Sequence, residues 1–423
     1  MKRLFSGIGI AGVACALLSG WQAKTPTTIL ITGDLLGHLE PCGCTFPQTG
    51  GLLREATLIR KIRSTSNVIV LASGSMVASP GRQSQIKTET VAAAYHDMGV
   101  DVIGLGNEDT RLGFSGILAI QNNAPDALIS GSLQQTSALN MPRTKGIGSL
   151  LVGSVSSHPE DLARPVQSPS IALGESIKSL KDDAKLNGQV PVLMVDGTVN
   201  EAKQIASQNP EIRLIVYRSP NDVPIAPIVV GKTVLVTPGQ GGKKIVRLTL
   251  DDDQMSGYQV IPLGPEFSDD PTVSKTYQSY LKQIDQLGLI DKLPRSKTSP
   301  YAGSAACMSC HQSAYKVWSH SKHAHALQAL ENVTHAKDPD CVSCHVVGLN
   351  SESGFRSRTL TPTLAGVGCE SCHGPAKRHT KMPRTAILPK VGSKPCISCH
   401  TSEQDPNFNA LTFKTKYWPK IKH

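Results

Sequence analysis

Four segments of the chain share the pattern Cys-x-x-Cys-His, and all four lie between residues 307 and 400. Two thiols three residues apart can each add to one vinyl group of a porphyrin, and the histidine that follows is then placed to coordinate the iron. With 11 cysteines and 13 histidines in 423 residues, about 0.01 such motifs are expected by chance. The sequence therefore predicts four covalently bound haem c groups. The attaching thiols are Cys307 and Cys310, Cys341 and Cys344, Cys369 and Cys372, and Cys396 and Cys399, and the proximal iron ligands are His311, His345, His373 and His400.

Structural zinc held by paired Cys-x-x-Cys knuckles is the alternative explanation for these cysteines. It does not explain why a histidine follows every pair. The part of the chain that carries the motifs is also poor in long apolar runs. Covalently bound porphyrins would supply the apolar volume that such a segment lacks.

The second axial ligand decides whether a haem carries electrons or binds a small molecule. Residues 318–326, residues 369–379 and the closing Ile421-Lys422-His423 make the segment Tyr301–His423 resemble the tetrahaem cytochrome c-554 family. The histidines outside the motifs in this segment are His320, His323, His325, His335, His379 and His423.

That resemblance implies three distal ligands. His323, twelve residues after His311, and His379, after the third motif, would reach across to other haems, and His423 is similar to a terminal ligand of close relatives. Family members combine three bis-histidine haems with one five-coordinate haem, which agrees with three candidates for four sites. Because no histidine lies between residues 346 and 372, the pairing of distal ligands with haems stays open. The other histidines are then surface or supporting residues: His320, His325 and His335.

The formal charge of +10 is concentrated in the same part of the chain. Residues 296–423 hold 16 Lys and Arg against 7 Asp and Glu, a net charge of +9. Residues 1–295 hold the remaining 27 Lys and Arg and 26 Asp and Glu, a net charge of +1. Four haems bring about eight propionate charges. No aromatic residues are interleaved with the basic residues between 377 and 384, which argues against a nucleic-acid site there. We interpret the densest basic residues as propionate partners and solvated surface: Lys377, Arg378, Lys381 and Arg384.

The N-terminus has the pattern of an export signal. Lys2 and Arg3 precede an apolar run, Leu4–Leu18, that is too short to span a membrane. We therefore predict a signal peptide over residues 1–23, with lipidation at Cys15 as the alternative to ordinary cleavage. No later run of 18 apolar residues follows. The sequence thus predicts a periplasmic or other extracytoplasmic protein, in the lipidated case an outer-membrane lipoprotein, with no integral membrane span.

Residues 24–290 alternate short β-branched runs with amphipathic helical patterns, which predicts a layered α/β domain. A connection over residues 291–302 then leads into a mostly helical or irregular haem domain, residues 303–423. The expected strands are Thr28–Thr32, Val68–Ala72, Asp101–Leu105, Leu150–Val155, Val190–Val195, Arg213–Tyr217 and Val234–Thr237, and the expected helices are Leu52–Arg63, Lys87–Met98, Ser176–Leu186 and Pro271–Leu287.

The order of these elements resembles the metallophosphoesterase domain of the 5'-nucleotidase family. The resemblance is carried by Gly33-Asp34 and Gly37-His38, by Gly50 to Arg54, by Gly104 to Glu108 and by Pro238 to Gly242. Such enzymes hold two metals with Asp, His and Asn side chains at strand ends.

The metal ligands that this resemblance implies are largely missing. Leu36 stands where a histidine is expected, Ser75 where an aspartate is expected, and Glu108 directly follows Asn107 without the usual histidine. Arg218 lies in the segment that replaces the late Gly-His-x-His. Asp34 and Asn107 alone cannot hold two hydrated cations, so we predict a retained scaffold with a silent site.

One cysteine pair remains unassigned, in Glu40-Pro41-Cys42-Gly43-Cys44 after His38. A strained local disulfide, a disulfide that only stiffens the loop, and a metal site with His38 or Glu40 are the alternatives for Cys42 and Cys44.

The sequence as a whole predicts an exported tetrahaem cytochrome that relays electrons, with a catalytically silent phosphoesterase-like domain. Redox proteins are the expected partners, either other cytochromes or a quinone-linked oxidoreductase. A haem enzyme that turns over a small nitrogen or sulfur species at one five-coordinate iron is the first alternative, and an active metallophosphoesterase is the second.

Overall fold

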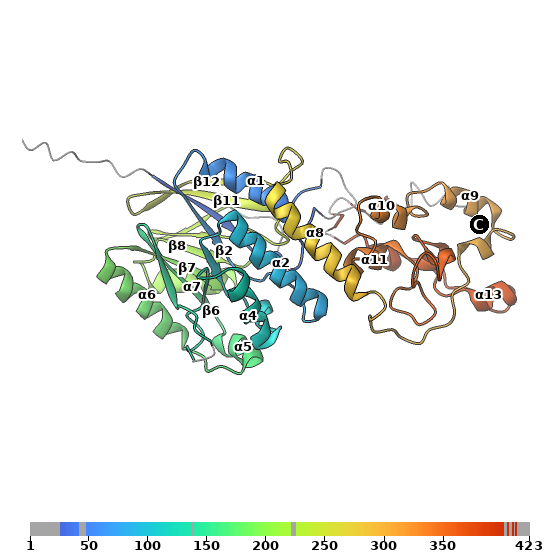
Figure 1. Ribbon diagram of the computed structural model, residues 1–423, viewed down its shortest axis with the longest axis horizontal. Helices are drawn as coiled ribbons and strands as arrows, with labels where there is room; N and C mark the ends of the chain where they lie inside the picture. Colours follow the sequence, from blue (N-terminus) through green and yellow to red (C-terminus); the bar gives the residue numbers. More distant parts are fainter. Residues whose placement is uncertain are drawn as a thin grey trace, which may run out of the picture.

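The chain folds into two lobes (Figure 1). An α/β domain contains all the named strands, and a smaller lobe of short helices carries the four Cys-x-x-Cys-His motifs. Among the described residues, no helix is long and apolar enough to cross a membrane. The computed structural model describes residues 26–41, 48–136, 139–220, 226–401, 404–405, 408–409 and 411–412.

The α/β domain is built on two six-stranded mixed sheets. In each sheet four neighbouring strands are parallel, so their carboxyl ends lie along one edge. The first sheet has the order β12 (Gln254–Pro262), β11 (Lys244–Asp251), β1 (Thr27–Thr32), β2 (Val68–Ala72), β3 (Val102–Gly104), β4 (Leu128–Ile129). The second has the order β5 (Thr144–Ile147), β6 (Leu150–Ser156), β7 (Val190–Asp196), β8 (Leu214–Tyr217), β10 (Thr233–Val236), β9 (Ile228–Val230).

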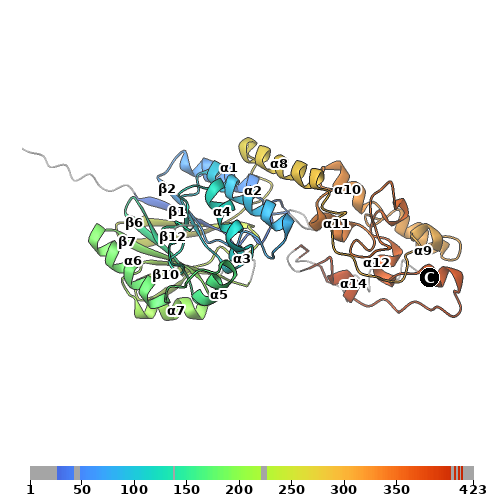
Figure 2. The same ribbon diagram turned by 60° about the horizontal axis from the view of Figure 1, so that its bottom comes forward.

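The two sheets pack face to face with helices on both outer faces (Figure 2). Apolar side chains of both sheets, such as Ile31 of β1 and Met194 of β7, form one core between them. Strands buried on both faces read as continuous apolar runs, as in Val68–Ala72, where every residue is buried. The helices of this domain are α1 (Leu52–Arg63), α2 (Arg82–Met98), α3 (Asn107–Thr110), α4 (Gly113–Asn123), α5 (Pro159–Ala163), the 3-10 turn η1 (Arg164–Val166), α6 (Leu173–Asn187), α7 (Val199–Gln208) and α8 (Pro271–Leu287).

The sequence patterns located the strands and helices well. All seven expected strands are present with ends within one residue, and Leu52–Arg63 and Pro271–Leu287 are helices with the expected bounds. Helix α2 begins at Arg82, earlier than the expected Lys87. Its first turn is exposed or half-buried, so no apolar period marks it. The long antiparallel pair of β11 and β12 was not predicted.

Helix α8 lies between the two lobes (Figure 1). The Asp270 side chain caps its N-terminus by accepting hydrogen bonds from the backbone N–H groups of Thr272 and Val273. Gly288, in the left-handed region at φ 57°, ends it. Arg295 then donates hydrogen bonds to the carbonyls of Leu349 and Phe355, so the connecting segment is held against the haem lobe.

The haem lobe consists of helices and 3-10 turns of three to eight residues joined by irregular chain. Its described apolar core is small, since nine buried side chains form it and one of them, Ile290, comes from the end of the α/β domain. A lobe with so little buried apolar area needs an additional source of stability. Its elements are the 3-10 turns η2 (Ser304–Cys307) and η3 (Pro362–Leu364) and the helices α9 (Gln312–Ser319), α10 (Ala326–Asn332), α11 (Pro339–His345), α12 (Cys369–His373), α13 (Lys377–Lys381) and α14 (Lys394–Ile397).

Candidate haem sites and the sheet-edge ion cluster

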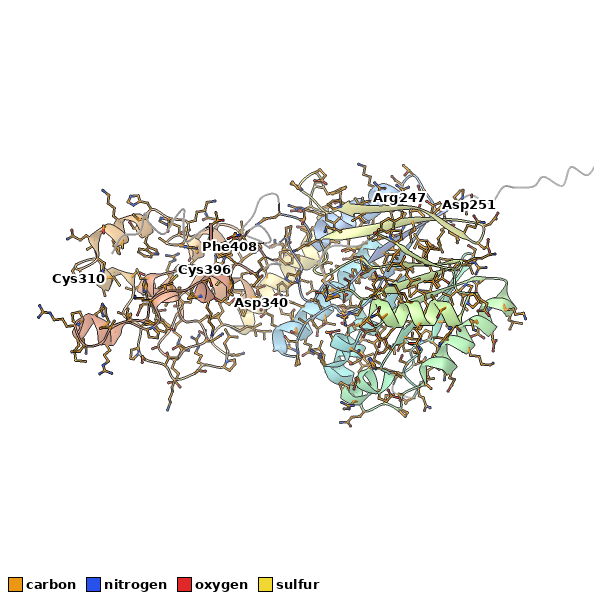
Figure 3. All side chains as sticks on the ribbon, turned by 180° about the vertical axis from the view of Figure 1, so that it is seen from behind. Arg247, Asp251, Cys310, Asp340, Cys396 and Phe408 are labelled. Atoms are coloured by element: carbon orange, nitrogen blue, oxygen red, sulfur yellow. The ribbon has the colours of Figure 1, made fainter. Side chains whose placement is uncertain are left out.

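The second and third motifs lie within the helices α11 and α12, the first motif begins at the last residue of η2, and the fourth begins in α14 and continues into the turn after it. Residues three apart on a helix lie on one face, which is the placement two thioether bonds to one porphyrin require. Each of the eight motif cysteines is at least partly accessible, and none of them forms a disulfide. Cys310 and Cys396 are labelled in Figure 3, with Cys310 at the far end of the lobe.

Thiols of different motifs lie next to one another. Cys307 of the first motif donates a hydrogen bond to Cys369 of the third, and this bond, against an opposing effect of burial, lowers the pKa of Cys369 to about 6. Cys399 of the fourth motif is likewise hydrogen-bonded to Cys344 of the second. Neither sulfur would titrate once it formed a thioether. These contacts bring the first motif beside the third and the second beside the fourth.

Two pairs of imidazole rings face each other. The ring centroids of His311 and His379 are 6.3 Å apart with an interplanar angle of 25°, and those of His323 and His400 are 6.1 Å apart at 66°. Two imidazoles on one iron, each with an Fe–N bond of about 2 Å, place their centroids roughly 6 Å apart. The residues present therefore fit haem iron between them.

The second ring nitrogen of several ligand candidates is occupied. Nδ1 of His379 is 3.0 Å from the carbonyl oxygen of Ala386, and Nδ1 of His345 is 2.7 Å from that of Ala326. Nδ1 of His400 is 2.7 Å from a carboxylate oxygen of Asp405. Because a carbonyl or carboxylate oxygen only accepts, Nδ1 carries the proton and Nε2 keeps its lone pair for a metal.

The remaining histidines differ from these pairs in their surroundings. His320 and His325 are exposed and hydrogen-bond the carbonyls of Lys316 and Ser319. His335 is half-buried and contacts Tyr277 of α8. Within the described residues, no histidine ring is stacked on His345. His423, expected as a distal ligand, lies outside the described residues.

A buried carboxylate inside the third motif ties this lobe together. Glu370 accepts hydrogen bonds from the backbone N–H groups of Ala302, Gly303 and Ala376, at 2.7 to 3.1 Å. It thereby joins the segment before the first motif to the segment that leads to His379. The sequence pattern gave no role to this residue, because the two middle positions of Cys-x-x-Cys-His carry no haem chemistry.

Residues 306–374 match the family model described as cytochrome c554 and c-prime. Cytochrome c-554 of Nitrosomonas europaea is 36% identical over 158 aligned residues, which span 29% of this chain and 67% of that protein. The chain belongs to the cytochrome c-554 family. Membership rests on the haem lobe, and it implies covalently bound haem c and an electron-carrying role.

The α/β domain of this family member has a cluster of charged side chains at the carboxyl ends of its parallel strands. Asp34 follows β1, Glu108 lies in α3 after β3, Asp196 ends β7, and Arg218 follows β8. The Arg218 guanidinium donates to all three carboxylates, with distances of 2.9 Å to Asp34, 2.6 Å to Glu108 and 3.0 Å to Asp196. The backbone N–H of Asn107 also donates to Asp196.

Burial sets the electrostatics of this cluster. It raises the pKa of Asp34 to about 7, although Arg218 opposes the shift. Burial lowers the pKa of Arg218, but the three carboxylates outweigh it and the net shift is upward. One guanidinium thus compensates three carboxyl groups, and Oδ2 of Asp34 and Oδ1 of Asn107 are buried without a hydrogen-bond partner.

These residues do not fit a two-metal centre. The Arg218 guanidinium bridges the carboxylates that could otherwise bind cations, and Leu36 and Ser75 supply neither the imidazole nor the carboxylate of such a site. In the described part of the chain, no three His, Cys, Asp or Glu side chains are grouped to hold a metal ion. Cys42 and Cys44 lie outside that part.

Two solved nucleotidases and a sulfate thiohydrolase nevertheless share the fold of this domain. A 5'-nucleotidase precursor from Thermus thermophilus superposes with a TM-score of 0.54 and 16% identity over 73% of this chain and 68% of its own. Haemophilus influenzae NAD nucleotidase superposes with a TM-score of 0.54 and 12% identity, over 66% of this chain and 64% of its own. A sulfate thiohydrolase from Thermus thermophilus superposes with a TM-score of 0.51 and 17% identity, and this chain spans 60% of its length. At these identities the likeness establishes the fold alone.

The sequence prediction included Asp34, Asn107 and Arg218 but missed the network that joins them. Asp196 was not singled out, although a carboxylate directly after a buried strand is the signal that could have identified it. Its partner Arg218 follows the next strand of the sheet, β8.

Replacing Arg218 with methionine tests what holds the cluster together. Removal of the guanidinium leaves three buried carboxyl groups unpaired, and we expect a loss of about 3–5 kcal/mol in the free energy of unfolding at pH 8. A carboxyl whose pKa is higher in the folded than in the unfolded chain takes up a proton on folding, so stability falls as pH rises from 3.8 toward 7. The loss should therefore be smaller at pH 5. Urea unfolding at both pH values measures it.

Arg213→Met is the matched control. The Arg213 side chain has the same 18% exposure, but it faces one exposed carboxylate, that of Asp253. We expect a loss of about 1 kcal/mol or less from its ion pair. Equal losses in the two variants, without dependence on pH, would contradict the compensation described above.

Proposed function

We propose that this protein is an exported tetrahaem c-type cytochrome that relays electrons and carries a catalytically silent α/β domain. The observation that carries the proposal is the spacing of the two imidazole pairs, 6.3 Å and 6.1 Å between centroids. Iron with two axial histidines is saturated and low-spin, so it exchanges electrons without binding substrate. Membership of the cytochrome c-554 family supports the same role.

The imidazole pairs support a specific assignment of axial ligands. His379 would be the distal ligand of the first haem, opposite His311, and His323 that of the fourth, opposite His400. Burial and the charges of His400 and His345 lower the pKa of His323, which favours the neutral imidazole that iron requires. His423 remains our proposal for a third distal ligand.

The contacts between motifs support a route for electrons. Cys307 contacts Cys369, Cys372 interacts with Cys396, and Cys399 contacts Cys344. The haems would then follow one another in the order first, third, fourth, second. An electron could enter at either end of this series.

The second haem supports an alternative function. Its motif histidine, His345, has no facing imidazole within the described residues, unlike His311 and His400. A five-coordinate iron at this position would bind a small nitrogen or sulfur species, and the protein would then be a haem enzyme.

We propose the domain bounds given by the sequence: a signal peptide over residues 1–23, with lipidation at Cys15 as the alternative, the α/β domain over 24–290, the connection over 291–302 and the haem domain over 303–423. The protein would act in the periplasm or at the cell surface. Its partners would be other cytochromes or a quinone-linked oxidoreductase.

The basic surface of the haem lobe supports an acidic redox partner. Between residues 377 and 394 all six Lys and Arg side chains are exposed, and this segment contains no acidic residue. Such a field speeds the encounter with a partner of opposite charge. The six cations are Lys377, Arg378, Lys381, Arg384, Lys390 and Lys394.

The first prediction concerns the haems themselves. The purified protein should contain four haem c groups per chain by the pyridine haemochrome assay. Its EPR spectrum should be dominated by low-spin iron. A single high-spin signal that shifts with nitric oxide would favour the alternative with an open second haem. Fewer than four haems per chain would contradict the proposal.

The second prediction concerns the distal ligands. In His379→Ala and in His323→Ala, one low-spin haem should become high-spin and bind carbon monoxide when reduced, because each change opens one axial position. His325→Ala is the matched control, since its ring contacts a backbone carbonyl and is exposed. It should keep the wild-type spectrum. An unchanged spectrum in His379→Ala would disprove the assigned pair.

The third prediction concerns the α/β domain. With Mn²⁺ added, the protein should hydrolyse neither nucleoside monophosphates nor a chromogenic phosphate ester, because the Arg218 guanidinium neutralises the carboxylates at the strand ends. A turnover that depends on Mn²⁺ and is abolished by Asp34→Asn would overturn the proposal that this domain is silent.

A further inference from the structure

The two lobes meet at the segment that leads into the second haem motif. Asp338 and Asp340 precede Cys341, and both side chains are bound by residues of the α/β domain. Figure 3 shows Asp340 on the side of the haem lobe that faces the α/β domain, whereas Cys310 of the first motif lies at the opposite end. The second motif is thus the one next to the α/β domain.

Lys87 of helix α2 is the buried cation of this interface. Its Nζ lies 2.6 Å from a carboxylate oxygen of Asp340 and 2.7 Å from the carbonyl oxygen of Gly37, and its side chain is only 10% exposed. Gly37 belongs to the loop after β1 that also carries Asp34. One loop therefore contributes to the Arg218 cluster and to the contact with the haem lobe.

A second set of contacts fixes the same helix turn. Asp338 is buried and caps α11 by accepting a hydrogen bond from the N–H of Asp340 at 2.9 Å. Its carboxylate also accepts hydrogen bonds from Gln83 of α2 and Tyr280 of α8, both at 2.7 Å. Helix α11, which carries Cys341, Cys344 and His345, is therefore held at its N-terminal end by side chains of the α/β domain.

The charges of Lys87 and Asp340 would act on a haem attached at the neighbouring Cys341. Burial lowers the pKa of Lys87, but Asp340 and Asp338 outweigh it, so the amine stays protonated. Reduction of a haem adds one negative charge, which a nearby cation favours and a nearby anion opposes. Lys87 and Asp340 therefore exert opposite effects, and the loss of either leaves the other uncompensated.

We propose that Lys87 and Asp340 position the second haem and set its reduction potential, so that the α/β domain is a working part of the electron-transfer unit. This inference rests on the proposed function, because it requires haem at Cys341, Cys344 and His345. It assigns a role to a domain whose strand-end site does not fit metal ions.

The test is a double-mutant cycle on the full chain matured with haem c, read out by spectroelectrochemical titration. Lys87→Met should lower one of the four midpoint potentials, and Asp340→Asn should raise the same one. For Lys87→Met the expected change in the reduction equilibrium is about tenfold, which is 59 mV for a one-electron couple. Because the Asp340 side chain is 64% exposed, Asp340→Asn should raise the potential by less, and the double variant should lie between Lys87→Met and the wild type. A Cys341→Ala/Cys344→Ala chain, which lacks the second haem, identifies the potential concerned.

Lys337→Met is the matched control. Lys337 also crosses the interface, to Asp285 at 3.3 Å, but its side chain is 63% exposed, whereas that of Lys87 is 10% exposed. The Lys337→Met substitution removes one positive charge, as Lys87→Met does, but at a position where solvent screens that charge. All four midpoint potentials should therefore stay at their wild-type values. Lys87→Arg keeps the charge and should also leave them unchanged, which separates charge from packing.

Two results would overturn the proposal in different ways. If the wild type holds four haems and neither Lys87→Met nor Asp340→Asn moves the second potential, the coupling is disproved and the electron relay stands. If the wild type itself carries no haem at Cys341 and Cys344, the proposed tetrahaem function fails together with this inference.

Discussion

Covalent attachment of haem is the constraint on which the C-terminal lobe depends. Its motifs lie in or next to helices of four to seven residues, which are marginal as isolated helices, and its described apolar core comprises nine side chains. A porphyrin bonded to two cysteines and to an iron ligand supplies both crosslinks and apolar surface, so cofactor binding and folding are coupled as they are in small metal-binding domains. The contacts of Glu370 and Arg295 order the backbone around these groups but do not replace them.

The α/β domain follows a different principle, in which the scaffold is kept and the chemistry at its edge is changed. Its two sheets and outer helices bury extensive apolar surface without any cofactor. At the strand ends the guanidinium of Arg218 provides positive charge where related folds use cations, and this charge is covalently part of the chain. In the loop after β1, the carbonyl of Gly37 accepts a hydrogen bond from Lys87, whose amine also binds Asp340 of the neighbouring lobe.

The sequence predicted those features that depend on local pattern. Buried parallel strands such as Val68–Ala72 are continuous apolar runs, and haem attachment requires a fixed spacing, so both could be recognised from a few consecutive residues. Contacts between side chains far apart in the sequence could not be predicted in this way. Arg218 meets Asp34 across 184 positions and Lys87 meets Asp340 across 253. A lone arginine after a strand or a lysine on a helix has many alternative partners until the fold is known. The same reason hid the pairing of His311 with His379 and of His323 with His400.

The closeness of thiols from different motifs has a consequence for biogenesis. In the folded chain Cys307 lies beside Cys369, and Cys344 lies beside Cys399. An oxidant would join such neighbours as disulfides between motifs, and each would remove one attachment point from two haems at once. Attachment of haem converts these thiols to thioethers, which an oxidant can no longer join. The cofactor would thus protect the lobe against crosslinking as well as stabilise its fold.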